Sequence, residues 1–294
     1  MHRVNADLAL LLAAAIWGTA FVFQKTAMAH VGPLTFIAAR CALAALALLP
    51  LAWLEGRRTP GPVGWPFLSV AGAGGLAFFL AAWLQQWGLV ATTATSAGFF
   101  TALYVVMTPF IAWIWSGAAP GVAVWPAVAL SAVGTWLLGG GAVGGFAPGD
   151  QLVMLSAVLW AAHVVITGRA SPFRRPIAFT AVQLAIVAVL ATAGAAVCES
   201  PTLDGLAAAG LDIAYVGLLS SALTFTLLTV ALQHTPPSEA AVIVSLETVF
   251  AALGGYLILG ERLSGLGLVG AALILLAILC IQLGPALAAR QAPG

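Results

Sequence analysis

Two short stretches of the sequence decide the fold: AAAIWGTAFVF at residues 13–23 and SAVLWAAHVVI at residues 156–166. A shift of 143 residues lays the first on the second, with Trp17 on Trp160. The same ungapped shift pairs Asp7 with Asp150, Pro33 with Pro176, Phe36 with Phe179, Gly74 with Gly217, Thr92 with Thr235, Leu103 with Leu246 and Gly117 with Gly260. The sequence therefore predicts a tandem duplication. We expect a first repeat at residues 1–146, a second at 147–288 and a short tail at 289–294.

The composition places both repeats in a membrane. Of the 294 residues, 62% are hydrophobic and 6% are charged, whereas a soluble domain carries about 25% charged residues. The net charge of +1 gives no basic field for nucleic acid. A nucleic-acid-binding protein and a soluble enzyme are therefore excluded, and the lipid bilayer is the expected surrounding.

Apolar runs long enough to span a bilayer follow one another along the whole chain. They lie at residues 7–29, 33–54, 65–88, 94–115, 122–142, 150–169, 176–198, 208–232, 238–259 and 265–286. Because each repeat holds five helices, an odd number, the second repeat must enter the membrane from the opposite side. We predict an all-α integral membrane protein whose ten transmembrane helices form two inverted-topology repeats, with a substrate site between them.

Basic residues in the short loops set the expected orientation. A cytoplasmic N-terminus places Arg3, Arg57, Arg58, Arg169, Arg174, Arg175 and Arg290 on the cytoplasmic side. The other side then has only Lys25 and Arg262, with Arg40 inside a helix. Both termini are therefore predicted to be cytoplasmic.

Two motifs resemble a known family. The string Trp17-Gly18-Thr19-Ala20-Phe21 and the stretch SEAAVIVSLETVFAALGGYLILGERLS at residues 238–264, with its Gly260-Glu261 pair, resemble the drug/metabolite transporter superfamily and, within it, the EamA-type exporters. This resemblance covers nearly the whole chain. It implies a ten-helix protein of the bacterial inner membrane that exports small metabolites, foremost amino acids, with aromatic ones favoured.

The chain departs from the family pattern at two positions. Thr248 stands where the family often has proline after Leu-Glu, which puts a kink in that helix in doubt. The first repeat has Gly117-Ala118 without the acidic residue.

Glu247 is the leading candidate for a binding residue. A charged side chain at a helix centre costs about 2.5 to 3.5 kcal/mol on insertion scales, and Glu247 is expected near mid-membrane in the helix at 238–259. The repeat pairs it with Tyr104, and Ala240, Ala251 and Gly254 on its face are expected to leave open space beside it. It could bind a substrate amine or carry a proton; the alternative is a protonated structural residue bonded to a neighbouring helix.

Aromatic and polar side chains inside the helices are the other candidates. His163 follows Trp160 on the same helix face and fits a proton relay or an interhelical hydrogen bond. Trp17, Phe21 and Trp160 could form facing aromatic walls or pack in the core. Further candidates for the lining are Phe78, Phe79, Trp83, Gln86, Phe100, Ser221 and Thr224.

Lys25, Arg40 and Asp212 lie toward the non-cytoplasmic ends of their helices. They could form an outer gate or attract a carboxylate, but Lys and Arg near helix ends also reach outward to the interface. Pro109 is expected to bend its helix. The small residues Gly265, Gly267 and Gly270 fit close helix packing and a homodimer face equally well.

The predicted function is alternating-access export of a small-molecule substrate from a central cavity. No cofactor is expected: Cys41, Cys198 and Cys280 lack metal-ligand spacing, and no Walker loop is present. A multidrug or other metabolite carrier of the same fold is the alternative. A channel and a membrane-embedded enzyme are more distant, and Glu247 with His163 is the only pair that could serve an enzyme.

Overall fold

The computed structural model describes residues 3–59, 63–117, 124–138, 140–141, 146–235, 240, 243–244 and 246–291. Its elements in the first repeat are α1 (Arg3–Ala27), α2 (Pro33–Arg58), α3 (Trp65–Val90), α4 (Ala94–Thr101), α5 (Tyr104–Ser116) and α6 (Val124–Leu138). Those in the second are α7 (Pro148–Gly168), the 3-10 helix η1 (Ser171–Phe173), α8 (Pro176–Cys198), α9 (Leu203–Ala208), α10 (Gly210–Ala214), the π-helix η2 (Tyr215–Leu223), α11 (Thr224–Ala231), α13 (Glu247–Leu259) and α14 (Gly265–Gln291).

The described part of the chain consists of helices joined by short loops and contains no strand. Seven helical segments are long and apolar enough to cross a membrane, and three shorter apolar helices lie in α6, α13 and α14. Each of these segments lies along one of the ten predicted spans, the three shorter ones over only part of it, because a backbone in lipid must satisfy its hydrogen bonds within each helix. The all-α membrane fold is confirmed.

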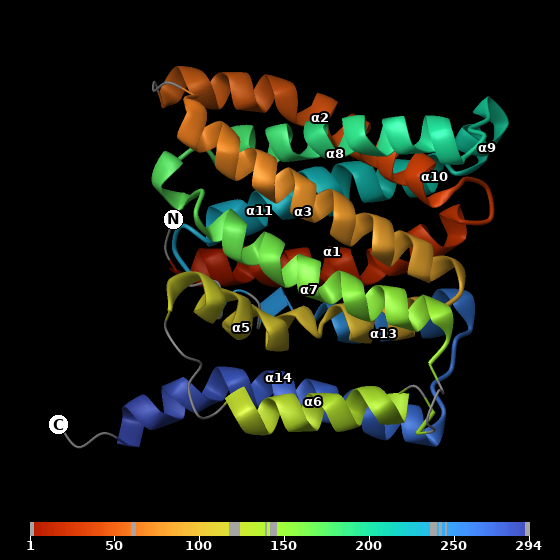
Figure 1. The fold of residues 1–294 in the computed structure, drawn as a ribbon, viewed down its shortest axis with the longest axis vertical. Coiled ribbons are helices and arrows are strands. Elements are labelled where there is room, and N and C mark those ends of the chain that lie inside the picture. The colour runs from red at the N-terminus through yellow and green to blue at the C-terminus, as the bar shows by residue number, and fades with distance from the viewer. Residues whose placement is uncertain are drawn as a thin grey trace.

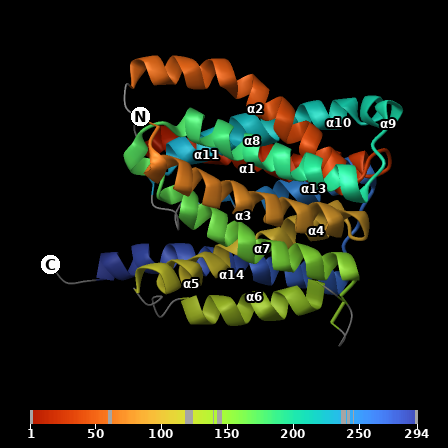
Figure 2. The same ribbon diagram turned by 45° about the horizontal axis from the view of Figure 1, so that its top comes forward.

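The helices pack as a two-fold related set. α2 packs against α8 at one end of the molecule and α6 against α14 at the other, with α1, α3, α7, α11 and α13 between them (Figures 1 and 2). Contacts between other helices occur in matched pairs. α3 packs on α7, and their counterparts, η2 with α11 and α1, pack on each other in the same way. α1 packs on α13, and their counterparts, α7 and the pair α4 and α5, do the same. Each of these contacts therefore has its counterpart in the other repeat.

Two glutamates show that the repeats run in opposite directions. Glu55, near the end of α2, accepts the backbone N–H groups of Ile177 and Ala178 at the start of α8 at 3.1 and 2.8 Å. Glu199, just after α8, accepts those of Leu34 and Thr35 at the start of α2, both at 2.8 Å. Each helix thus ends where its repeat counterpart begins, which is the inverted arrangement, and each carboxylate satisfies unpaired donors at a positive helix end.

One glycine of the row in α14, Gly270, packs against another helix of the same chain. A Cβ on Gly134 of α6 would lie 2.7 Å from the carbonyl oxygen of Gly270. Only glycine permits this close approach of α6 and α14. Gly270 therefore faces the chain's own α6.

The spans predicted at 94–115 and 238–259 each contain a short turn within the described residues. The first is interrupted between α4 and α5 at Ala102 and Leu103, and the second has a turn at Leu246 directly before α13. The backbone bonds match across the two repeats: Val106 donates to Leu103 as Val249 donates to Leu246, both at 3.0 Å and three residues apart. Pro109 lies inside α5, beyond the interruption, and its counterpart is Ala252. Proline is therefore not needed for the break.

Candidate functional site

A cavity lies where the two repeats meet, with about 660 Å³ of space not filled by protein atoms, part of it open to solvent. Its walls come from α1, α2, α3, α4 and α5 of the first repeat and from α7, η2, α11 and α13 of the second. The lining residues are Trp17, Phe21, Gln24, Arg40, Gln85, Thr101, Tyr104, Trp160, His163, Val164, Ser220, Phe225, Leu228, Val244 and Glu247.

The repeat accounts for most of this lining. Ten of the lining residues form five pairs that are 143 residues apart: Trp17 with Trp160, Phe21 with Val164, Gln85 with Leu228, Thr101 with Val244, and Tyr104 with Glu247. The cavity therefore lies on the two-fold axis that relates the repeats, as in other inverted-repeat carriers.

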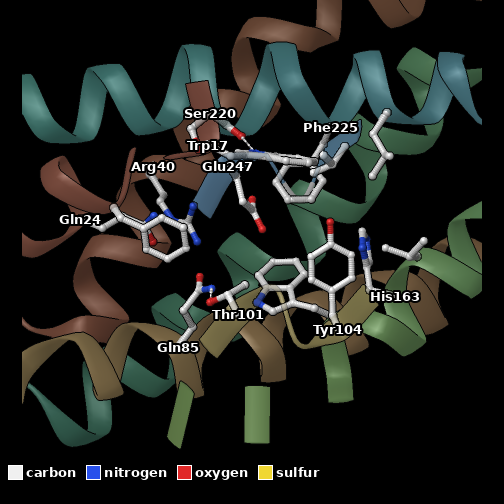
Figure 3. A pocket seen from close by; sticks show the side chains of 15 residues that line it. Trp17, Gln24, Arg40, Gln85, Thr101, Tyr104, His163, Ser220, Phe225 and Glu247 are labelled. Carbon is white, nitrogen blue, oxygen red and sulfur yellow. Dashed lines mark hydrogen bonds between the residues drawn. The ribbon is translucent and has the colours of Figure 1, made fainter. Parts of the chain in front are cut away.

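Tyr104 and Glu247 begin the second halves of the two interrupted helices. Tyr104 is the first residue of α5 and Glu247 the first of α13. At each turn the backbone hydrogen bonds continue with a spacing of three residues, so the helix tightens there, and matched positions of the two repeats place Tyr104 and Glu247 at the cavity. Figure 3 shows the carboxyl group of Glu247 directed into the cavity and Tyr104 rising from the facing wall.

Close contact between α1 and α13 fixes the position of Glu247. A Cβ on Gly18 would lie 2.8 Å from the backbone nitrogen of Ala251, so only glycine lets the two helices approach this closely. A Cβ on Gly254 would lie 3.0 Å from Val22. The small residues of α13 thus pack against α1, and the expectation that they leave open space beside Glu247 is wrong.

Aromatic rings form one side of the cavity. Phe225 lies 4.8 Å from Trp17, 5.9 Å from Trp160 and 5.7 Å from His163, measured between ring centroids. Phe78 supports this group from behind, at 5.1 Å from Trp160 and 4.5 Å from Phe225. These distances are those of favourable aromatic pairs, so the rings form a firm apolar wall.

Polar groups gather on the other side. Arg40 is 3% exposed, and its Nη1 donates to the Ser221 hydroxyl at 3.3 Å. Gln85 donates to the Thr101 hydroxyl at 2.8 Å. In Figure 3, Arg40 and Gln24 lie on one side of Glu247, and Phe225 and His163 lie on the other. The cavity therefore has a charged end and an aromatic end.

The π-helix η2 places backbone polar groups at the cavity wall. The Ser220 carbonyl oxygen accepts the indole N–H of Trp17 at 2.8 Å and also the Thr224 hydroxyl. A π-helix gains a residue relative to an α-helix and often occurs at functional sites. Here it holds Trp17 of the first repeat against the second.

The structure brings six of the predicted binding residues together at the cavity: Trp17, Phe21, Tyr104, Trp160, His163 and Glu247. The other predicted residues lie outside the lining. Phe78 and Phe100 are buried behind it, and Phe79 stacks on Trp83. Gln86 donates to the backbone carbonyl of Gln24. Ser221 accepts a hydrogen bond from Arg40, and Thr224 donates one to the backbone carbonyl of Ser220.

The three charged residues predicted at the outer side do not lie together. The ammonium group of Lys25 donates to the carbonyl oxygens of Leu89 and Val90 at 2.7 and 3.2 Å, so it caps the end of α3. Asp212 accepts the Thr26 hydroxyl at 2.9 Å. Arg40 alone reaches the cavity.

Sequence reasoning missed several lining residues. Gln24 lies seven residues after Trp17 and three after Phe21, so helical spacing could have identified it. Val164 could have been found by carrying Phe21 across the repeat, whereas Gln85 and Leu228, and Thr101 and Val244, are counterparts only of each other, so the repeat gives no signal for them. Phe225 has Ala82 as its counterpart, so no signal of this kind marks it.

Two inverted helical repeats around one shared cavity are the architecture of many secondary transporters. The chain belongs to the EamA-like transporter family, whose pattern matches residues 4–140 and again residues 147–283. It is therefore a multi-pass membrane protein of a transporter family.

Individual relatives match over different lengths. An uncharacterized transporter of Archaeoglobus fulgidus is 32% identical over 96% of this chain and 87% of its own length. The uncharacterized transporter YwfM of Bacillus subtilis is 26% identical over 95% of this chain and 94% of its own. The threonine/homoserine exporter RhtA of Salmonella typhimurium is 30% identical over 49% of this chain and 47% of its own.

A solved crystal structure shares the fold. It superposes with a TM-score of 0.73 over 99% of both chains, at 19% sequence identity. At this sequence identity, the similarity shows only that the two proteins share a fold.

Proposed function

We propose that this protein is a secondary transporter that exports amino acids, aromatic ones in preference, by alternating access at the central cavity. The observation that carries the proposal is the cavity itself, where Trp17, Trp160 and Phe225 face a buried guanidinium and a buried carboxyl group. An aromatic side chain stacked on such a wall gains about 0.5 to 1.5 kcal/mol beyond its area burial.

The relationship to RhtA supports amino acids as the substrate class. RhtA is named a threonine/homoserine exporter and matches about half of this chain. Threonine and homoserine are polar, whereas one side of the cavity here is aromatic. Export of amino acids with larger, apolar side chains fits this lining better.

The paired architecture supports alternating access. Both repeats contribute to one cavity, and each contributes a helix that is interrupted at the cavity wall. Rocking of one repeat against the other would open the site first to one side of the membrane and then to the other. The charge distribution in the loops supports an orientation with both termini in the cytoplasm, and membership of the EamA-like family supports a bacterial inner-membrane location.

A multidrug or other metabolite carrier is the second candidate. Glu247 among aromatic rings also suits a planar organic cation. Arg40 in the same cavity opposes this ligand, because it places a like charge near the cation. The amino-acid proposal uses both charges.

Counterflow in proteoliposomes tests the proposal. Vesicles loaded with unlabelled tryptophan should take up labelled tryptophan to above its equilibrium level, with saturation, because a carrier exchanges its substrate. Phenylalanine and tyrosine should compete better than serine or asparagine. Competition by organic cations without competition by any amino acid would overturn the proposal in favour of the multidrug carrier, and non-saturating flux would indicate a channel.

A further inference from the structure

Arg40 and Glu247, one basic and one acidic residue, line the same cavity and do not pair with each other. Arg40 is 3% exposed and Glu247 is 4% exposed. Within the described residues, Nε of Arg40 and Oε1 of Glu247 have no hydrogen-bond partner, and no ion pair joins the two side chains. An unsatisfied donor or acceptor is costly to bury, so each of the two side chains keeps hydrogen-bonding capacity for a ligand.

We propose that Arg40 and Glu247 together bind the backbone zwitterion of the amino-acid substrate, with the carboxylate on Arg40 and the ammonium group on Glu247. This inference rests on the proposed function and specifies its chemistry. A guanidinium presents N–H donors in a planar fork that matches a carboxylate. A glutamate carboxylate accepts the N–H groups of an ammonium.

A zwitterion fits the charge balance better than a singly charged ligand. An anion would satisfy Arg40 and leave the Glu247 carboxylate buried without a partner, and a cation would do the reverse. Only a ligand with both charges compensates both side chains, which is the condition for burying them at acceptable cost.

Neighbouring polar groups fit the same headgroup. Gln24 is 5% exposed, and its Oε1 has no hydrogen-bond partner among the described residues. Gln24 lies beside Arg40 (Figure 3), so its amide borders the proposed headgroup site and can hydrogen-bond to the headgroup.

The cavity also orients the substrate. Arg40 and Gln24 lie on one side of Glu247, and Phe225 and His163 lie on the other (Figure 3). A substrate with its headgroup on Arg40 and Glu247 would direct its side chain toward Phe225 and the two cavity tryptophans, Trp17 and Trp160. The headgroup site therefore selects amino acids as a class, and the aromatic side selects among them.

Three ligands that share the indole ring and differ in their charged groups test the assignment on the wild-type protein. L-tryptophan carries both groups, tryptamine lacks the carboxylate and indole-3-propionate lacks the ammonium. We expect each truncated ligand to compete with labelled tryptophan at least about tenfold more weakly than tryptophan itself, since each leaves one buried charge without its partner.

Two variants assign the charges to residues. Arg40→Gln should abolish the preference for tryptophan over tryptamine and keep the preference for tryptophan over indole-3-propionate. Glu247→Gln should keep the preference over tryptamine and abolish the preference over indole-3-propionate. Arg57→Gln and Asp204→Asn remove exposed charges outside the cavity and should change neither preference. Size-exclusion profiles in detergent check folding, and the wild-type ligand series decides the matter if a variant does not fold.

The outcomes separate this inference from the proposed function. Exchange of tryptophan with equal competition by both truncated ligands would leave amino-acid transport intact and overturn the zwitterion site. Unchanged preferences in folded Arg40→Gln and Glu247→Gln would overturn it as well. Absence of exchange with every amino acid tested would overturn the proposed function first, and the inference with it.

Discussion

Five positions line the cavity in both repeats, and at four of them the two repeats differ in chemistry. The first repeat contributes Phe21, Gln85, Thr101 and Tyr104, where the second contributes Val164, Leu228, Val244 and Glu247. The tryptophans Trp17 and Trp160 are the only lining pair of identical residues among these positions. Duplication thus supplied a symmetric frame, and later substitution made its contents asymmetric.

The charges show this divergence most clearly. Arg40 comes from the first repeat, and its counterpart Gln183 is outside the lining, 3.4 Å from Nε2 of His163. Glu247 comes from the second repeat, and its counterpart is Tyr104. Each repeat therefore supplies one charge, so a zwitterion bound between them would link the two halves that must move relative to each other.

Topology gives the largest, all-or-none test of the inverted relationship. Reporter fusions at Gly61 and Arg290 should read cytoplasmic and a fusion at Pro148 should read outside, because five spans separate corresponding points of the repeats. Alkaline phosphatase and fluorescent-protein fusions at each site give complementary signals. Fusions at 61 and 148 that read the same side would remove the inversion on which the comparison depends.

The pair at the helix breaks should respond unequally to mutation. Glu247→Gln should weaken tryptophan binding by about 10- to 100-fold, because a hydrogen bond to a charged group contributes about 1.5 to 3 kcal/mol. Tyr104→Phe removes one neutral hydroxyl and should weaken binding by no more than about 10-fold. Competition curves in counterflow measure both.

The pH response distinguishes binding by Glu247 from proton transport. If Glu247 carried the proton instead, Glu247→Gln would exchange tryptophan normally and lose only its response to a pH gradient. Normal exchange and a normal pH response would make Glu247 a structural residue.

The tryptophan pair should share a role in selectivity and differ in stability. Trp17→Ala and Trp160→Ala should each reduce the preference for tryptophan over serine by about 2- to 10-fold, the value of one aromatic contact. Trp17→Phe should also lower stability by about 1 kcal/mol, because the indole bond to Ser220 is lost. Trp160 has no indole partner among the described residues, so Trp160→Phe should lose less. Unchanged selectivity in both alanine variants would reduce the tryptophans to packing residues.

The capping glutamates give the smallest and most local test. Glu199 accepts two backbone N–H groups and the Thr35 hydroxyl, whereas Glu55 accepts two N–H groups and faces Ala178 in place of that threonine. Glu199→Gln should therefore cost about 1 to 2 kcal/mol and exceed Glu55→Gln by a few tenths. Thermal unfolding in detergent measures the difference, and Thr35→Ala should remove most of it. If Glu199→Gln and Glu55→Gln lowered stability equally in the protein that keeps Thr35, the extra contribution of the Thr35 hydroxyl bond would be contradicted.

The sequence predicted the helices and their inversion for a physical reason. Each span must bond its own backbone in lipid, so the ten apolar runs could be read without knowing their neighbours. The matched Trp17 and Trp160 then showed the duplication, and the odd helix number required the inversion. Glu247 could be selected as a candidate because a carboxyl group in an apolar helix is rare.

Features that depend on packing between helices could not be read in this way. The direction of Arg40 depends on how α2 is rotated against α8 and η2, so its depth alone left an interfacial and an interior position open. Ser221 was expected in the lining, but the π-helix shifts the angular position of each residue, and Ser220 lines the cavity instead. The breaks before Tyr104 and Glu247 likewise follow no proline in either repeat.

Side-dependent labelling tests the central claim most directly: that the cavity between the repeats binds the transported amino acid and opens to each side in turn. Thr101 and Val244 are a repeat-related pair in the lining. Each would be changed to cysteine in a protein whose Cys41, Cys198 and Cys280 are replaced by alanine. A membrane-impermeant maleimide should modify both positions from either side of the membrane, and tryptophan should slow the modification from both. Modification from one side only, or no protection by any transported amino acid, would contradict the claim.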